Sequence, residues 1–535
     1  MAGRQKDKPA SERLRIGVDV GGTNTDAVVM GDAGVVSWFK TPTTDDVGSG
    51  IVTAIEHLLS ENALSHTAIG SVMIGTTQFT NALVERKKLV EVGIIRIGLP
   101  ATASIPPLSD WPRDLVRSVG QHIHLVGGGY EFDGRKIAEL DEDAILKAAQ
   151  DFKGKGLRAI AISCVFSPMS AAMEERAAEI VRREIPDARI TLSSEVGRMG
   201  LLERENAAIL NASLSRLSGR VIKSCSAALR RLKIKAPLYI SQNDGTLMGV
   251  ERAERFPVMT FASGPTNSMR GAAFLSGLDQ AIVIDIGGTT MDVGVLARGF
   301  PRESSVSVDI GGVRTNFRMP DILSVGLGGG SLVRSCPDGA ITVGPDSVGF
   351  RLTERARVFG GDDLTATDIA VAAGIARIGD PAAVTNISPE LVSEAVKVIQ
   401  RAITDAVDRM KTSAAEVPVI LVGGGSILAP KDIRGASRVL MPEHYSVANA
   451  IGAAIAQASG EVDKVYSYDL LGRDGSIAQA TQEARAAAVA AGADADSLKV
   501  IDITELPLAY IPGGTVRLRI KVVGDRRDLS TTGVG

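Results

Sequence analysis

Two copies of one glycine-rich pattern contain the residues of this chain best suited to chemistry. In each copy an aspartate ends an apolar run and is followed by one apolar residue, Gly-Gly-Thr, two further residues and a second aspartate, at 19–26 and 285–292. Glycines let phosphate oxygens approach main-chain N–H groups, and the threonine hydroxyl adds a donor. A carboxylate repels phosphate but suits a Mg²⁺-bound water beside it. The pair predicts two hairpins that hold a nucleotide's phosphates from both sides.

The pattern assigns a role to each residue type. We expect Asp19 and Asp285 to hold Mg²⁺ through water and, with Thr23 and Thr289, to form the catalytic set. One such hairpin is equally consistent with an ordinary tight turn, but the near-identical repeat favours a ligand site. The predicted phosphate-binding residues are Gly21, Gly22, Thr23, Asn24, Gly287, Gly288, Thr289 and Thr290.

Two further glycine clusters follow apolar runs. Gly423, Gly424 and Gly425 stand between a predicted strand and a predicted helix at 445–458, where a flat base or ribose can lie against bare backbone. We expect this cluster to bind adenosine; a helix-entry loop without a ligand is the alternative. The second cluster includes Gly328 and Gly329, and there phosphate contact and a packing turn are equally consistent.

Polar loops between predicted elements are the candidates for substrate binding. They supply hydroxyl, amide and carboxylate groups, although the segment 75–86 is also consistent with a capped helix start. No histidine lies near the Ser-Gly-Pro loop in the sequence, so its serine is not expected to be a nucleophile. The candidates are Thr76, Thr77, Asn81, Glu195, Asn243, Asp244, Ser263 and Gly264.

Length and composition limit the class of protein. A chain of 535 residues is too long for one core. Its 44% hydrophobic and 23% charged residues are ordinary for a globular protein. The net charge of −3 predicts no nucleic-acid partner, and the three separated cysteines predict neither a disulfide framework nor a metal site. Without a secretory signal or a long apolar run, we expect a cytoplasmic protein with no membrane span.

Apolar strands alternate with helical patterns from Leu14 onward, which is typical of α/β units. Helices are predicted at 141–153 with Asp141 as N-cap, along a long stretch at 202–233, and at 391–410. The predicted division is a flexible tail at 1–13, a first domain at 14–200, a second domain with substrate-facing insertions at 201–464, and a small α+β appendage with a tail at 465–535.

These motifs, in this order, resemble the hydantoinase/oxoprolinase family of the actin-like ATPase superfamily, over residues 14–460. The resemblance implies an α/β fold of duplicated actin-like (ribonuclease H-like) domains, with a nucleotide cleft between them. It rests on the segments 17–26, 75–86, 210–212, 263–265, 285–293, 328–331 and 423–426.

The resemblance also implies an activity. Family members use ATP and Mg²⁺ to open cyclic amides such as hydantoins, 5-oxoproline or lactams by phosphorylating a carbonyl oxygen, usually with a second, hydantoinase B-type subunit in an oligomer. Three alternatives stay open: an ATP-dependent ketone carboxylase subunit, a sugar-kinase-like phosphotransferase and a nucleotide-gated scaffold. Ser194 replaces a histidine common in the family, and Asp244 replaces a glycine. The resemblance therefore does not predict which ring compound is the substrate.

Overall fold

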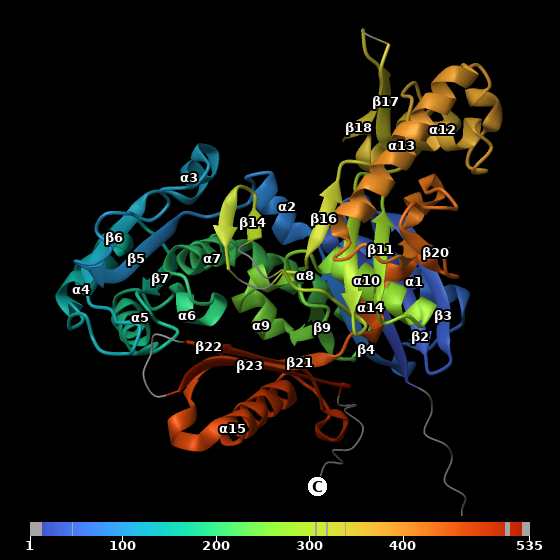
Figure 1. The fold of residues 1–535 in the computed structure, drawn as a ribbon. Coiled ribbons are helices and arrows are strands. Elements are labelled where there is room, and N and C mark those ends of the chain that lie inside the picture. The colour runs from blue at the N-terminus through green and yellow to red at the C-terminus, as the bar shows by residue number, and fades with distance from the viewer. Residues whose placement is uncertain are drawn as a thin grey trace, which may run out of the picture.

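The computed structural model describes residues 13–44, 46–304, 308–316, 319–337, 339–508 and 514–526. All of the predicted tail at 1–13 except Arg13 lies outside these residues. The fold has two α/β lobes, a third α/β unit beside them and a C-terminal α+β segment beneath them (Figure 1).

The first lobe is built on a nine-stranded sheet of order β22-β23-β21-β10-β9-β4-β1-β2-β3. Its strands β1 and β2 form the first predicted hairpin, and β4 runs parallel to β1. Helices α1 (Val47–Glu61) and α8 (Ser215–Arg231) pack on one face. The strands from the first half of the chain are β1 (Leu14–Val20), β2 (Asn24–Gly31), β3 (Gly34–Pro42), β4 (Ile69–Thr76), β9 (Leu238–Ser241) and β10 (Leu247–Gly249).

Two helices cross tightly on the other face of this sheet, α10 (Ser263–Ser276) and α14 (Ala448–Ile455). A Cβ on Gly271 would lie 1.9 Å from the Ala448 carbonyl oxygen, and a Cβ on Gly452 would lie 1.8 Å from the backbone carbonyl oxygen of Asn267. The glycines are therefore required for this approach. The crossing brings both helices beside the hairpin, although they are far apart in the sequence.

The second lobe repeats the arrangement. Strands β11 and β12 form the second predicted hairpin, and β19 runs parallel to β11 as β4 does to β1. Helix α13 (Pro389–Met410), predicted at 391–410, packs on this sheet through Ile399, Ile403 and Val407. The other elements here are β11 (Ala281–Ile286), β12 (Met291–Ala297), β13 (Phe300–Pro301), β16 (Ile322–Val325), β17 (Ser331–Ser335), β18 (Ile341–Ser347), α12 (Ala366–Ala372), β19 (Val417–Val422) and β20 (Ala436–Leu440).

The third unit is a parallel sheet of order β6-β5-β7-β8. The predicted helix at 141–153 is confirmed as α4, and the Asp141 side chain accepts a hydrogen bond from the Ala144 N–H. The elements are β5 (Val92–Leu99), α3 (Arg113–Val119), β6 (His122–Gly127), α4 (Glu142–Gly154), β7 (Ala159–Cys164), α5 (Ala172–Glu184), β8 (Arg189–Leu192) and α6 (Ser193–Val196).

The helical stretch predicted at 202–233 is confirmed, and it is divided into two helices, α7 (Leu201–Ser213) and α8. The break lies at Leu214, which has φ −90° and ψ −5°. Just before it, the Ser213 hydroxyl donates 2.7 Å to the Leu210 carbonyl, a local bond that competes with helix continuation. The break turns α7 toward the third unit.

A buried ion pair fixes α7 to the third unit. Arg96 on β5 donates from Nε to Glu205 Oε2 on α7 at 2.7 Å, and both side chains are nearly inaccessible. Ser163 donates to the same carboxylate at 2.6 Å. Replacing Glu205 with Gln leaves a buried guanidinium without its counter-charge, so we expect the free energy of unfolding to fall by about 3 kcal/mol. Urea unfolding measures this, with the exposed pair Glu394–Lys397 as control: Glu394→Gln should change stability by less than about 0.5 kcal/mol.

The C-terminal segment is α+β, but its strands complete the first sheet. Strand β23 (Thr515–Gly524) pairs with β21 (Ala458–Ser467) and β22 (Lys499–Pro507). One face of β23 packs on α15 (Tyr468–Ala490), and the other presents Lys521, 3% exposed, to Asp244 at 2.7 Å. Strands on both sides of the predicted boundary at residue 200 therefore share one sheet.

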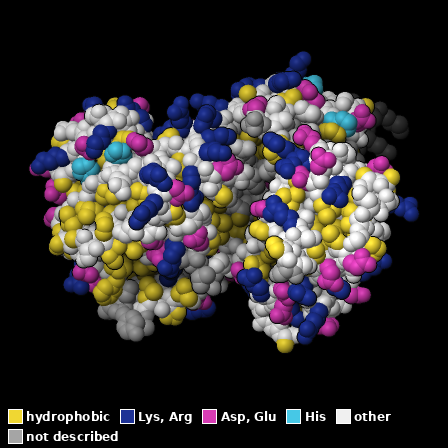
Figure 2. Space-filling model, turned by 90° about the horizontal axis from the view of Figure 1, so that it is seen from above, with side chains coloured by type: hydrophobic (Ala, Val, Ile, Leu, Met, Phe, Trp, Pro, Cys, Tyr) yellow, Lys and Arg dark blue, Asp and Glu magenta, His cyan; other side chains and the backbone are white. Residues whose placement is uncertain are grey.

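The surface of the protein is mixed in charge. Figure 2 shows one face, hollowed between two masses, with Lys and Arg interspersed among Asp and Glu. Within the described part of the chain, no helix combines the length and apolarity that crossing a membrane requires. The short elements are η1 (His66–Ala68), α2 (Gln78–Val84), α9 (Val250–Arg255), η2 (Pro257–Thr260), β14 (Val308–Ile310), β15 (Val313–Thr315), η3 (Gly349–Arg351), α11 (Leu352–Arg355), η4 (Arg357–Phe359), η5 (Pro381–Val384), η6 (Gly424–Leu428), η7 (Tyr445–Val447) and η8 (Ala495–Ser497).

Candidate active site

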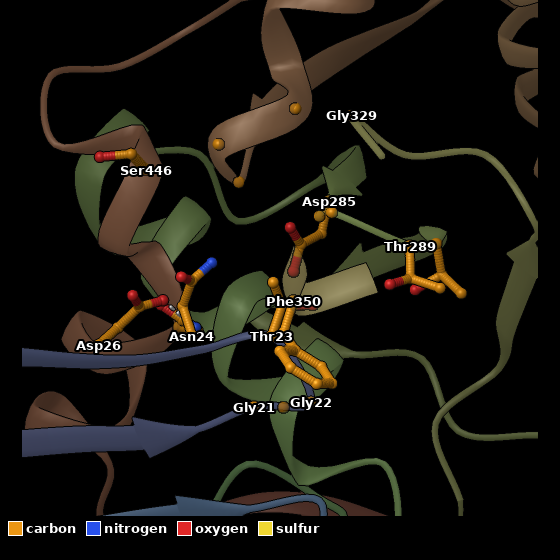
Figure 3. Close-up of a pocket in the computed structure, with 18 of the residues that line it drawn as sticks. Gly21, Gly22, Thr23, Asn24, Asp26, Asp285, Thr289, Gly329, Phe350 and Ser446 are labelled. Atoms are coloured by element: carbon orange, nitrogen blue, oxygen red, sulfur yellow. Dashed lines mark hydrogen bonds between the residues drawn. The ribbon is translucent and has the colours of Figure 1, made fainter. Parts of the chain in front are cut away.

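The two glycine hairpins meet across a cleft of about 570 Å³ between the lobes. Their turns close in the same way: the Gly21 N–H donates to the Asn24 carbonyl at 3.0 Å, and the Gly287 N–H donates to the Thr290 carbonyl at 2.9 Å. A Cβ on Gly288 would lie 3.4 Å from the side chain of Thr23. The turn tips of the two lobes therefore face each other at close range, as Figure 3 shows.

Most of the predicted site residues line this cleft. Gly328 packs behind the second turn, where a Cβ would lie 2.6 Å from the Thr289 nitrogen. Thr76 and Ser263 lie just behind the cleft wall, with the Ser263 hydroxyl 3.5 Å from the Thr76 carbonyl. The predicted residues on the lining itself are Asp19, Gly21, Gly22, Thr23, Asn24, Thr77, Asn81, Gly264, Asp285, Gly287, Gly288, Thr289, Thr290, Gly329, Gly423, Gly424 and Gly425.

Three predicted substrate residues lie elsewhere. Glu195 forms an ion pair of 2.5 Å with Arg255. Asn243 is buried, and Asp244 pairs with Lys521. None of the three is on the cleft lining, and Glu195 and Asp244 are each paired with a cation of the protein.

Each hairpin contributes two facing carboxylates. Asp19 lies opposite Asp26, and Asp285 lies opposite Asp292, so four aspartates line the cleft. Burial, together with the charge of Asp26, raises the pKa of Asp19 to about 7. Burial also raises the pKa of Asp285, and that of Asp292 to about 7. Asp26 and Asp292 were not among the predicted site residues, although the repeated pattern ends on them.

This charge balance fits a bound divalent cation. Lys40 is the one Lys or Arg among the described residues that line the cleft, against four carboxylates. In the described ranges no group of three His, Cys, Asp or Glu side chains is arranged to chelate a metal directly. Mg²⁺ commonly binds through one or two carboxylates, waters and substrate phosphates, without an all-protein cage. Asp19 and Asp285 therefore suit water-mediated binding.

Two side chains that the sequence analysis missed fix these carboxylates. Asn449 on α14 donates to Asp19 Oδ2 at 3.1 Å and to Asp26 Oδ2 at 2.7 Å. Ser268 on α10 donates to Asp285 Oδ2 at 2.5 Å. Figure 3 shows Asp26 and Asp285 projecting from different sheets into the same space. The crossing of α10 and α14 thus orients the acidic groups of both lobes.

The turn at Gly423 packs directly against Asp285. Gly423 has φ +85°, and a Cβ there would lie 2.1 Å from Asp285 Oδ1. The helix predicted at 445–458 is shorter than expected, because α14 starts at Ala448 and Ala458 already belongs to β21. Five apolar side chains that sequence reasoning missed also line the cleft: Phe350, Leu352, Phe359, Ile378 and Ile427.

Comparison with known families agrees with this geometry. Residues 15–185 match the family described as "Hydantoinase/oxoprolinase N-terminal region". Residues 204–380 match the family described as "Hydantoinase/oxoprolinase". The chain belongs to the hydantoinase/oxoprolinase family. Both hairpins fall inside the matched ranges, and the family predicted from the motifs is confirmed.

Relatives within the hydantoinase/oxoprolinase family are subunits of larger enzymes. Caprolactamase subunit alpha of Pseudomonas jessenii is 31% identical over 395 residues, 68% of this chain and 55% of that protein. Acetophenone carboxylase gamma subunit of Aromatoleum aromaticum is 28% identical over 397 residues, 67% of this chain and 53% of that protein. The chain thus spans about half the length of these two relatives.

The crystal structure of the ATP-dependent caprolactamase from Pseudomonas jessenii has the same fold. It superimposes with a TM-score of 0.77 at 22% identity, covering 95% of this chain and 87% of that chain. The predicted fold class, two ATPase-like α/β lobes with a C-terminal α+β segment, is confirmed.

Proposed function

We propose that this chain is the ATP-dependent subunit of a hydrolase that opens a cyclic amide of the hydantoin, 5-oxoproline or lactam type. The observation that carries the proposal is the pair of Gly-Gly-Thr turns lining one cleft, so close that a Cβ on Gly288 would lie 3.4 Å from the side chain of Thr23. Two turns that face each other in this way suit a polyphosphate held from both sides. Membership of the hydantoinase/oxoprolinase family supports the cyclic amide as substrate class.

The phosphates would lie against the backbone N–H groups of the two turns, with the hydroxyls of Thr23, Thr289 and Thr290 as further donors. Asp19 and Asp285 would hold Mg²⁺ through its waters, as their position on the acidic lining supports. When bound, the metal neutralises charge on the transferring phosphoryl group. Gly329, Gly423, Gly424 and Gly425 would carry the rest of the nucleotide, with the adenine against apolar side chains of the lining.

The proposed reaction has three balanced steps. The ring carbonyl oxygen attacks the γ-phosphorus; an O–P bond forms as the bond from phosphorus to the β,γ-bridging oxygen breaks, and ADP leaves. Water adds to the activated ring carbon, the C–N bond breaks, and the nitrogen leaves with a proton from that water. A second water releases phosphate from the acyl phosphate, which leaves a carboxylate and an amine.

The ring would lie beside Asp19, between α2 and the first turn of α10. Thr77 and Asn81 line the cleft there, and a Cβ on Gly264 would lie 3.8 Å from Asp19 Oδ2. Their hydroxyl and amide groups suit a ring carbonyl and N–H. Thr76 and Ser263 would support this wall from behind. Glu195, Asn243 and Asp244 are left out of the proposed site.

The test is ADP release from Mg·ATP across hydantoins, 5-oxoproline, lactams and small ketones. Each compound is assayed with and without a hydantoinase B-type subunit, because the relatives are named as subunits. Stimulation by one ring compound, with a ring-opened product, supports the hydrolase. Silence across all rings despite ATP binding contradicts it.

A second candidate is an ATP-dependent ketone carboxylase subunit, which the acetophenone carboxylase relative supports. The same cleft would then phosphorylate a different carbonyl. ADP release that requires both a ketone and bicarbonate favours this candidate over the hydrolase.

In either case we propose a cytoplasmic hetero-oligomer, since ATP and Mg²⁺ are available in the cytoplasm. The domain boundaries at 14–200, 201–464 and 465–535 stay predictions.

The aromatic ring of Phe350 provides a test of the adenine position. Phe350 lines the cleft yet is 57% exposed, so replacing it with Ala should leave the thermal midpoint unchanged. Loss of a base-stacking surface should weaken Mg·ATP binding by about tenfold. Mg·triphosphate, which has no base, should bind both forms equally in a competition assay.

The matched control for this variant is Phe274, which is 48% exposed and outside the cleft lining. Phe274→Ala should bind Mg·ATP as the wild-type chain does. If Phe350→Ala also binds Mg·ATP normally, the adenine lies elsewhere.

A further inference from the structure

A row of three side chains crosses the first sheet beside its phosphate-binding turn. Asp19 on β1 faces Asp26 on β2, and Asp26 faces Lys40 on β3. Directly opposed residues of antiparallel strands present their side chains to the same face of the sheet. Lys40 Nζ lies 2.7 Å from Asp26 Oδ1. The row therefore ends in an ammonium group.

The second lobe repeats this row with one difference. Asp285 on β11 faces Asp292 on β12, and Asp292 faces Ser324 on β16. Ser324 donates its hydroxyl hydrogen to Asp292 Oδ1. The third position of the row is thus cationic in the first lobe and neutral in the second. Among the described residues that line the cleft, the one ammonium group therefore belongs to the first lobe.

The surroundings of Lys40 leave its ammonium available to a ligand. Its side chain is 28% exposed, and it lines the cleft. An ammonium has three donor hydrogens, and Asp26 Oδ1 accepts one of them. Asn449 binds the other oxygen of Asp26 at 2.7 Å, which fixes the carboxylate that holds Lys40. The charge also reaches the opposite lobe: burial raises the pKa of Asp285, and Lys40 opposes that rise.

We propose that Lys40 is a catalytic residue that contacts the phosphoryl group transferred from ATP, and that Asp26 is the positioning residue that holds it. The proposal rests on the proposed function of the cleft. Charge spreads over the equatorial oxygens of the phosphoryl group during transfer, and preorganised cations stabilise it. In this role Lys40 donates hydrogen bonds and makes no covalent bond.

A purely structural Lys40 would neutralise Asp26 and nothing more. The two roles differ in what they do to nucleotide binding. A contact with the transferred phosphoryl group affects Mg·ATP and spares Mg·ADP, which lacks that group. A structural ion pair affects the thermal midpoint and affects both nucleotides alike. The ratio of the two dissociation constants therefore separates the roles.

The experiment measures Mg·ATP and Mg·ADP binding by calorimetry for the full chain and for Lys40→Met. We expect Mg·ATP to bind about tenfold more weakly, because the loss of one hydrogen bond to a charged group typically weakens binding by about this factor. The affinity for Mg·ADP should change by less than about twofold. Lys40→Arg should retain most of the Mg·ATP affinity. Lys464→Met is the matched control, because Lys464 forms an ion pair of the same 2.7 Å length with Glu483, outside the cleft lining.

Loss of Lys40 leaves Asp26 without its cation, so the single variant can fold poorly. The double variant Lys40→Met with Asp26→Asn removes both charges and tests the same ratio. Equal weakening of both nucleotides, or no change in either, overturns the role of Lys40 while leaving the proposed function intact. Failure of the wild-type chain to bind Mg·ATP overturns both proposals.

Discussion

Asp19→Asn and Asp285→Asn should each lower Mg·ATP turnover by about 10³-fold, the largest effect on activity that the structure leads us to expect. Each variant removes one of the two carboxylates proposed to hold Mg²⁺ through water. The amide keeps the shape of the side chain but not the charge. The measurement is steady-state ADP release with the ring compound that stimulates the wild-type chain.

Stability separates the metal role from a role in folding. Burial raises the pKa of Asp19 to about 7 from 3.8, so the folded state favours the protonated form. The stability that this protonation contributes is present below pH 3.8 and is lost as pH rises through 7. At pH 8 the neutral Asn avoids the buried charge, and the thermal midpoint of Asp19→Asn should not fall below that of the wild-type chain.

The control for these variants is Asp346→Asn, which removes an exposed carboxylate that pairs with Arg334 at 2.5 Å in the second lobe. Its turnover should equal that of the wild-type chain. Normal turnover in both cleft variants would refute the metal role. A thermal midpoint that collapses along with turnover would instead indicate a structural role.

The hairpins could be predicted from the sequence because each is a local unit. An apolar run, a turn that needs glycine and a second apolar run specify their own pairing, and Asp19–Asp26 and Asp285–Asp292 follow from it. The duplication then specified two facing turns. The glycine cluster at Gly423, which is proposed to bind adenosine, could be located for the same reason, since the strand β19 leads directly into it.

Contacts between distant segments could not be predicted in this way. Asn449 and Asp19 are separated by 430 residues, and only the crossing of α10 and α14 brings them together. Lys40 has no local signal, because its position depends on the register of β3 against β2. Asp244 stands in a polar turn typical of a binding site, but its carboxylate forms an ion pair with Lys521 of β23.

The C-terminal strands show the same limit. Their alternation could be recognised, but not the sheet that they join. On β23 the apolar positions Leu518, Ile520 and Val522 pack on α15, and the charged positions face the body of the protein, where Lys521 is 3% exposed. Charged residues alternating with apolar ones normally predict a face in water. Here ion pairs with Asp244 and Glu303 bury that face.

Gly423→Ala should lower the free energy of unfolding by about 4 kcal/mol and abolish Mg·ATP binding. Gly423 has φ 85° and ψ 153°, a conformation essentially restricted to glycine. Its added Cβ would also lie 2.1 Å from Asp285 Oδ1. Relief of that clash must move either the strand end or the carboxylate proposed to hold Mg²⁺. Urea unfolding and nucleotide calorimetry measure the two effects.

The next residue separates these two effects. Gly424 also lines the cleft, but a Cβ there would meet nothing within 4 Å. Gly424→Ala should therefore keep the stability of the wild-type chain while its methyl group occupies space proposed for the nucleotide, so Mg·ATP should bind about tenfold more weakly. If Gly424→Ala binds Mg·ATP normally, the nucleotide does not lie against this turn. Unchanged stability in Gly423→Ala would contradict the predicted clash between the added methyl group and its neighbours.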